Sequence, residues 1–214
     1  MIKNKTKMAI LLLSFAVISL PAIVNAAITV NLDTAFSNYD PFETADFGTV
    51  ELTDLDDDIQ FEVTLNTDVL GSGADLQWFY FNTTEGITNL SISSTTPDAT
   101  LSYQFNTTSS TFRADGSGYY DGILDFGAGG SQTATATFVL SADDALEIDD
   151  FLTTSTSSSN GEYIFAVHVQ STEFLDQTSE FIGGNTVVPI PSALWFLGAG
   201  LASLVGLRKR NTSL

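Results

Sequence analysis

The chain has 214 residues, no cysteine, and 26 acidic residues against seven basic ones. The basic residues lie almost entirely at the two ends, so residues 27–187 carry every acid and a single base, Arg113. A body this acidic excludes a nucleic-acid-binding protein, because no basic patch is present to neutralise phosphates. The absence of cysteine excludes disulfides, thiolate catalysis and cysteine-ligated metal sites.

The first 26 residues have the three-part layout of a secretory signal peptide. Three lysines precede an apolar run at 8–20, and a small-x-small sequence ends at Ala26. The apolar run is shorter than the roughly 20 residues that a membrane-spanning helix needs. We therefore predict export through the Sec machinery, cleavage between Ala26 and Ala27, and a mature chain that begins at Ala27.

The last segment, residues 188–211, predicts a membrane span. Residues 190–207 contain no charged side chain, and as a helix they would extend over roughly 27 Å, enough to cross a bilayer core. Three bases, Arg208, Lys209 and Arg210, follow at once. Because such basic clusters are retained in the cytoplasm, the span is predicted to insert with the acidic body outside.

The same segment carries a specific motif. A proline pair, aromatic and small residues and the basic cluster occur in a fixed order at the end of the chain. The residues before the cluster are Val188, Pro189, Ile190, Pro191, Trp195, Gly198 and Gly200. This arrangement resembles the PEP-CTERM sorting tail, although Ile190 stands where the family carries the glutamate of its name.

The resemblance implies a processing route. PEP-CTERM proteins are substrates of exosortases, which are membrane enzymes of Gram-negative bacteria that make exopolysaccharide. It implies that the tail holds the protein transiently in the inner membrane and is processed near residues 188–191, after which the body reaches the cell surface or extracellular matrix. The alternative is an ordinary C-terminal anchor that is never cut.

Residues 27–187 are predicted to form one acidic all-β domain. Short strands with alternating or continuous apolar residues, separated by turn signals, favour a single antiparallel β-sandwich, either a jelly roll or cohesin-like. One short helix is expected over 142–151, with Ser141 as its N-cap, and an exposed loop over 153–161. The expected strands are 59–65, 77–82, 87–92, 101–105, 119–126, 133–140 and 163–170.

Calcium is the ligand that the acidic sequence would suit best. Asp54, Asp56 and Asp58 alternate along the chain, and hard carboxylate oxygens are calcium ligands in exported modules. The stretch does not fit an EF-hand loop, because Ile59 and Leu65 occupy the positions that need glycine and glutamate. The alternative interpretation is a solvated acidic turn beside a strand, with no cofactor.

Catalytic patterns are weak, and we expect a protein that is not an enzyme. The chain has one histidine, His168, which we interpret as a structural strand residue, and it lacks a G-x-S-x-G nucleophile elbow. The expected role is a structural or binding component of exopolysaccharide or biofilm. A calcium-dependent, lectin-like carbohydrate-binding module is the alternative, and a glycan-active hydrolase with paired carboxylates is less favoured.

Overall fold

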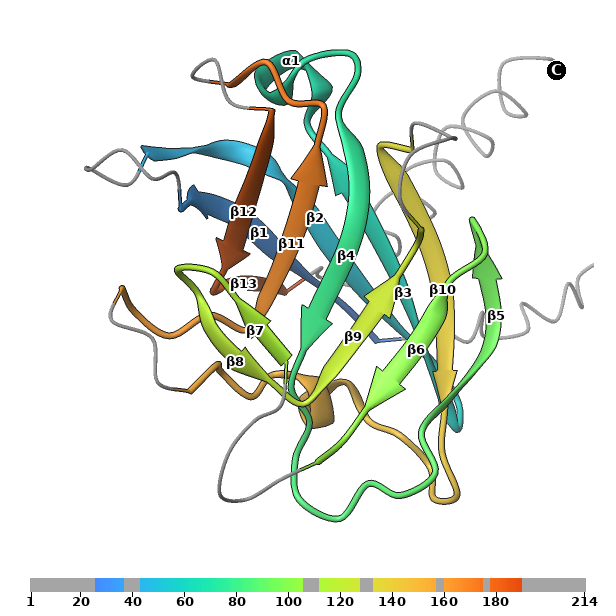
Figure 1. Cartoon of the computed structure of the whole chain (residues 1–214). Coiled ribbons are helices and arrows are strands. Elements are labelled where there is room, and N and C mark those ends of the chain that lie inside the picture. Colours follow the sequence, from blue (N-terminus) through green and yellow to red (C-terminus); the bar gives the residue numbers. More distant parts are fainter. Residues whose placement is uncertain are drawn as a thin grey trace, which may run out of the picture.

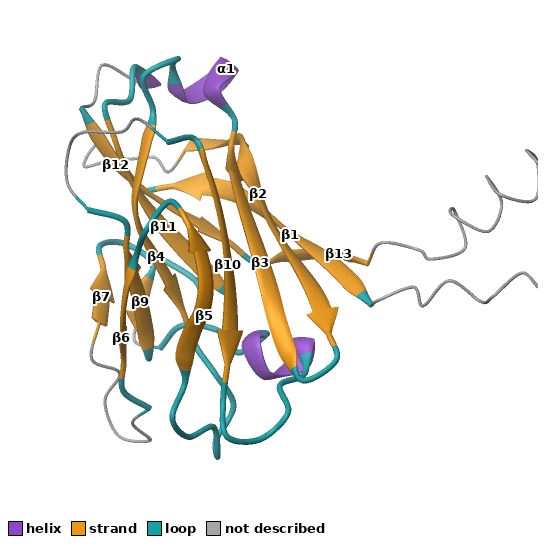
Figure 2. Cartoon of the chain, turned by 90° about the vertical axis from the view of Figure 1, so that its right-hand side faces the viewer, coloured by secondary structure: helices purple, strands orange, loops and turns teal. Residues whose placement is uncertain are grey.

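The computed structural model describes residues 26–36, 43–105, 112–127, 133–156, 160–174 and 178–189. These residues form antiparallel strands with very little helix (Figure 1). The strands are β1 (Ala27–Ala35), β2 (Glu43–Leu55), β3 (Asp58–Leu65), β4 (Asp75–Phe81), β5 (Ser91–Thr96), β6 (Thr100–Tyr103), β7 (Phe112–Ala114), β8 (Gly118–Tyr120), β9 (Gly122–Asp125), β10 (Thr135–Ser141), β11 (Phe165–Gln170), β12 (Ser179–Gly184) and β13 (Thr186–Pro189). The helical segments are α1 (Thr67–Leu70) and a 3-10 turn at Ile148–Phe151, which lie at opposite ends of the sheet (Figure 2).

One sheet contains most of these strands, in the order β5-β10-β3-β2-β1-β12-β11-β4-β9-β6, and it curls until it is nearly barrel-shaped. Strand β13 pairs with β1 beyond the end of β12, and β7 pairs with β8 in a separate two-stranded sheet. The all-β antiparallel prediction is confirmed at this level. The sheet stays open between β5 and β6, whose facing edges line a groove of about 650 Å³.

Aromatic side chains join the two halves of the curled sheet. In β3 every second side chain points inward, as the alternating sequence predicts, and Phe61 is completely buried. Its ring contacts Phe138 of the neighbouring strand β10 at 5.0 Å between centroids, and Phe79 and Phe165 of the opposite half at 5.9 and 6.1 Å. The described core residues all lie between Val30 and Ile182, so residues 27–189 contain the whole of the described core.

Strand β4 is buried on both faces. Phe79 faces the main core, whereas Tyr80 belongs to a smaller cluster on the outer face. That cluster is covered by the β7–β8 hairpin, whose Tyr120 has no exposed surface and lies 5.7 Å from Tyr80 between ring centroids. A strand covered on both sides needs no polar alternation, which is why its apolar residues are consecutive.

The helix expected over 142–151 is wrong. Strand β10 continues through Ser141, and the only helical residues in this stretch are the four of the 3-10 turn. Glu147, not Ser141, caps the turn, and its backbone N–H donates to Asp150 Oδ2 at 2.9 Å. The intervening chain instead binds neighbouring loops, since Leu146 N–H donates to the Asp57 carbonyl at 3.0 Å. These tertiary bonds outweigh the local helical preference.

The strand expected over 119–126 is divided in two at Asp121. Asn82 Oδ1 accepts the Asp121 backbone N–H at 2.9 Å, and Asp121 Oδ2 in turn accepts the Thr83 N–H at 3.4 Å. These buried bonds turn the chain from the outer hairpin into the main sheet. The expected 87–92 strand begins later, at Ser91, because Asn89 adopts a left-handed conformation with φ of 55°.

Part of the expected loop over 153–161 is also packed rather than exposed. Ser155 is buried and its hydroxyl donates to the Ser117 carbonyl, while Thr156 forms a β-bridge with Tyr119. These contacts fasten the segment to the β7–β8 hairpin. The sequence of small polar residues did not distinguish this packed segment from a solvated one.

Candidate functional site

The two chain ends of the sheet leave the domain side by side. Strand β1 begins at Ala27, and Ile28 is paired directly with Pro189 at the end of β13 (Figure 2). The described side chains of β13 are all exposed, and Val188 shows 45% of its surface. The last four residues of the sheet are therefore held by backbone pairing to β1 and not by core packing.

Most of the predicted sorting residues lie outside the part of the chain that the structure describes. Val188 and Pro189 are strand residues of β13, and Ala26 and Ala27 lie at the start of β1. The remaining residues of the motif lie outside the described part of the chain: Ile190, Pro191, Trp195, Gly198, Gly200, Arg208, Lys209 and Arg210. No helix within the described ranges is long and apolar enough to cross a membrane. The expected membrane span at 190–207 lies outside those ranges.

An acidic pocket lies next to the beginning of β1. It has a volume of about 330 Å³, and the turn between β2 and β3 meets the segment before the 3-10 turn there. Two of the three predicted calcium ligands are brought together in its wall, and two acids from the other segment join them. The acidic lining residues are Asp54, Asp56, Glu147 and Asp149, with Ala26 beside them.

The geometry of this pocket falls short of a preformed metal centre. Asp58, the third predicted ligand, lies in β3 opposite Leu55 and does not line the pocket. Among the described residues, no three carboxylates or histidines are close enough together to hold an ion. Asp54 Oδ1 is nonetheless buried and has no hydrogen-bond partner in the described structure. Glu147 and Asp149 could not be recognised from the sequence as neighbours of Asp54, because they are almost a hundred residues away from it along the chain.

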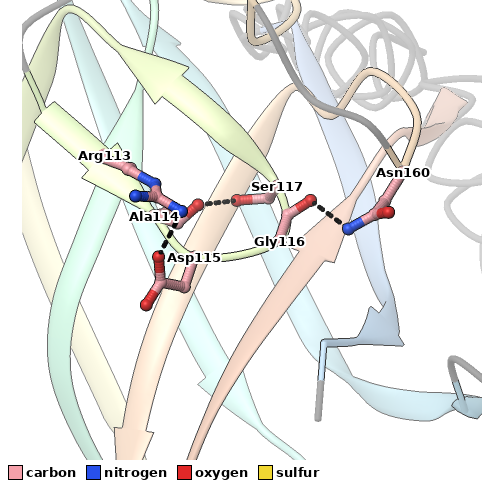
Figure 3. A network of polar contacts seen from close by, with 6 residues as sticks. All are labelled: Arg113, Ala114, Asp115, Gly116, Ser117 and Asn160. Atoms are coloured by element: carbon pink, nitrogen blue, oxygen red, sulfur yellow. Dashed lines mark hydrogen bonds and ion pairs between the residues drawn. The ribbon is translucent and has the colours of Figure 1, made fainter. Parts of the chain in front are cut away.

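The single base of the body is engaged in another part of the fold. Arg113 lies in β7, and its Nη2 atom is 3.1 Å from Asp115 Oδ1 in the hairpin that leads to β8 (Figure 3). The Asn160 side chain, from the segment before β11, donates to the Gly116 carbonyl of the same hairpin at 3.0 Å (Figure 3). Both partners of the ion pair are exposed, so the pair contributes little to stability.

His168 is packed as a structural residue of β11. Its ring lies between Trp78 and Phe181, at centroid distances of 4.6 and 4.5 Å, and it is 6% exposed. Burial lowers the pKa of His168 below its ordinary value, so the neutral imidazole is favoured. A ring enclosed by two aromatic side chains is not positioned to receive a proton from a substrate.

Glu180 carries a strongly shifted carboxyl group, but it faces away from solvent. It lies in β12 opposite Val169 and is 3% exposed. Burial raises the pKa of Glu180 to about 7, although the backbone amides of Phe181 and Phe36 act in the opposite direction. A glycan hydrolase needs an acid that touches its substrate, and Glu180 does not meet that requirement.

The groove between β5 and β6 is a different kind of surface. Apolar and uncharged polar side chains line it, and a second hollow of about 570 Å³ continues from it past Tyr103. The Tyr103 hydroxyl bonds to Thr83 Oγ1 at 2.8 Å, which fixes the ring between the two hollows.

Comparisons of the chain with protein-family models, curated proteins and solved structures find no match.

Proposed function

We propose that this chain is an exported bacterial surface or extracellular-matrix protein that an exosortase-type enzyme processes. The observation that carries the proposal is the order of signals along the chain: an export signal, an acidic domain, a proline motif, an apolar span and a basic stop. The pairing of the start of β1 with the end of β13 supports the proposal. The predicted signal peptide and the predicted sorting tail would both connect to the same corner of the domain, where they can reach one membrane.

The body then serves as a structural or binding component of exopolysaccharide or biofilm. We propose that its curled sheet is a sandwich of the jelly-roll or cohesin-like kind, in which β5-β10-β3-β2-β1 faces β12-β11-β4-β9-β6. The aromatic contacts between the two halves support this division. The strong negative charge keeps such a domain soluble during export and transfer.

Expression of the full chain in an exopolysaccharide-producing Gram-negative host tests the proposal. With an active exosortase, intact-mass measurement should show a protein that begins at Ala27 and has lost the residues beyond the proline motif. In a strain without the enzyme, the tail should remain and the protein should fractionate with the inner membrane. A Pro189→Ala, Pro191→Ala double variant should behave as in the enzyme-free strain. Identical masses in the two strains would rule out exosortase processing.

The convergence of acids in the pocket near Ala26 favours one second candidate, a calcium-dependent carbohydrate-binding module. Calcium at a hundred times its Kd should raise the stability by about 2.7 kcal/mol. For a domain of this size that is roughly a 5 to 10 °C rise in melting temperature. Thermal unfolding in millimolar calcium, equal magnesium and excess chelator checks this. An equal response to magnesium, or none, would remove the calcium candidate.

A further inference from the structure

Ala26, the residue just before the predicted mature start, lines the acidic pocket, and the peptide bond joins the Ala27 nitrogen directly to it. Ala27 is paired with Thr53, and the Ala26 carbonyl accepts the Asp54 backbone N–H at 3.0 Å. Ala26 lies opposite Asp54, one step beyond that pair, so the side chains of these two residues share one face of the sheet. The Ala27 side chain points to the other face, and only its backbone nitrogen adjoins the pocket. The uncut peptide link between Ala26 and Ala27 is therefore part of this pocket's rim.

Cleavage of that peptide bond would change the charge at this position. Hydrolysis breaks the C–N bond, the water oxygen remains on the Ala26 carboxylate, and the Ala27 nitrogen takes the protons and becomes an α-ammonium. That nitrogen starts only about 1.33 Å from the Ala26 carbonyl carbon, so it remains at the rim after Ala26 departs. An α-amino group has an ordinary pKa of about 7.7 to 8.0 and is mostly charged at pH 7.

The surroundings are suited to receive this cation. Asp54 Oδ1 is buried without a hydrogen-bond partner in the described structure, and the pocket holds three further carboxylates. The body's only basic side chain, Arg113, is bound to Asp115 in the outer hairpin. An ammonium supplies three donors, and a charge-assisted bond to a partly buried carboxylate is stronger than a neutral one.

We infer that signal-peptide cleavage creates an ion pair between the α-ammonium of Ala27 and the carboxylate of Asp54, which fastens the start of β1 in the acidic pocket. The inference rests on the proposed export function for the position of the cut. It gives the acidic pocket an occupant that the chain itself produces. Removal of the signal peptide would then stabilise the start of β1, which pairs with the end of β13.

A double-mutant cycle on residues 27–189 tests the ion pair in buffer that contains a chelator. One form begins at Ala27, and the other carries a Gly-Ser extension that moves the amine by as much as about 7 Å. The form that begins at Ala27 lacks the residue 26 carbonyl that accepts the Asp54 N–H, and this loss is the same in the native sequence and in Asp54→Asn. The melting temperature of the Ala27 form, relative to the extended form, should therefore be about 2 to 4 °C higher in the native sequence than in Asp54→Asn. Asp58→Asn, which removes an acid that does not line the pocket, should behave as the native sequence does. The same relative melting temperature in the native sequence and in Asp54→Asn would overturn the inference.

The composition of the chain provides a second readout. Residues 27–189 contain no lysine, so the α-amino group is the only primary amine that an amine-reactive ester can label. At pH 7 the folded form that begins at Ala27 should be labelled more slowly than the extended form, and Asp54→Asn should remove the difference. Urea should make both rates equal. Equal rates in the folded state would contradict the ion pair.

Failure of the inference and failure of the proposed function can be told apart. The recombinant domain has its N-terminus set by design, so its melting and labelling decide the ion pair alone. N-terminal sequencing of the exported protein decides where the signal peptide is cut. A start other than Ala27 would show that the ion pair does not form in the cell, whatever the recombinant domain does.

Discussion

Truncation of Phe61 to alanine is expected to lower the free energy of unfolding by about 3 to 5 kcal/mol. Phe61 is completely buried in β3, and its ring contacts four other aromatic rings at centroid distances between 5.0 and 6.1 Å. It joins both halves of the sheet to the 3-10 turn. Removal of the ring would therefore leave a cavity that no single neighbour can fill, and urea unfolding monitored by fluorescence measures the loss.

Phe112→Ala provides the matched control for this change. Phe112 lies in β7, is only partly buried, and packs against the small outer cluster. Its removal should cost roughly 1 to 2 kcal/mol, since less surface leaves contact. Equal losses for the two variants would show that the core is not organised around Phe61.

Replacement of Glu180 by glutamine is expected to remove a loss of stability that the native protein suffers between about pH 4.5 and 7. The unfolded glutamate has a pKa near 4.3, whereas burial raises the folded pKa of Glu180 to about 7. A raised pKa means that the folded state holds the proton more tightly. Its stabilising contribution is therefore complete below about pH 4 and is lost as the pH rises through 7. The total effect is about 3 to 4 kcal/mol.

The measurement is the free energy of unfolding in urea at several values from pH 4.5 to pH 8. The native chain should lose stability across this range, and Glu180→Gln should flatten the part of the decline that comes from this group. Glu62→Gln is the control, because that glutamate is exposed on β3 and should leave the slope unchanged. An unchanged slope in Glu180→Gln would show that Glu180 does not hold its proton in the folded state.

Alternation of apolar residues predicted the strands best. Residues 59–65 have a single strong period, and their strand was expected within one residue of its observed start. The same signal is present in β1, where Ile28, Val30 and Leu32 alternate, and in β2, although neither strand was among those expected. Strand β12 is different, because SEFIGG places a glutamate and two glycines in a buried strand. Only its neighbours explain its conformation.

Long-range contacts determined what the sequence could not predict. The 142–151 segment has helical capping residues, yet its loop is held by bonds to Thr88 and Asp57. The pocket likewise needs Glu147 and Asp149 beside Asp54, and no spacing rule connects acids so far apart in the sequence. Residue type indicated the chemistry of the pocket, whereas the tertiary fold decided its members.

The pairing of β1 with β13 has a mechanical consequence. Because these strands are antiparallel and their free ends leave together, a pull between Ala27 and Pro189 loads the Ile28–Pro189 pair first and then each following pair in turn. Hydrogen bonds that are loaded one at a time yield at much lower force than bonds sheared together. Under tension between its two ends, the domain would therefore peel open at this corner while the aromatic core stays intact.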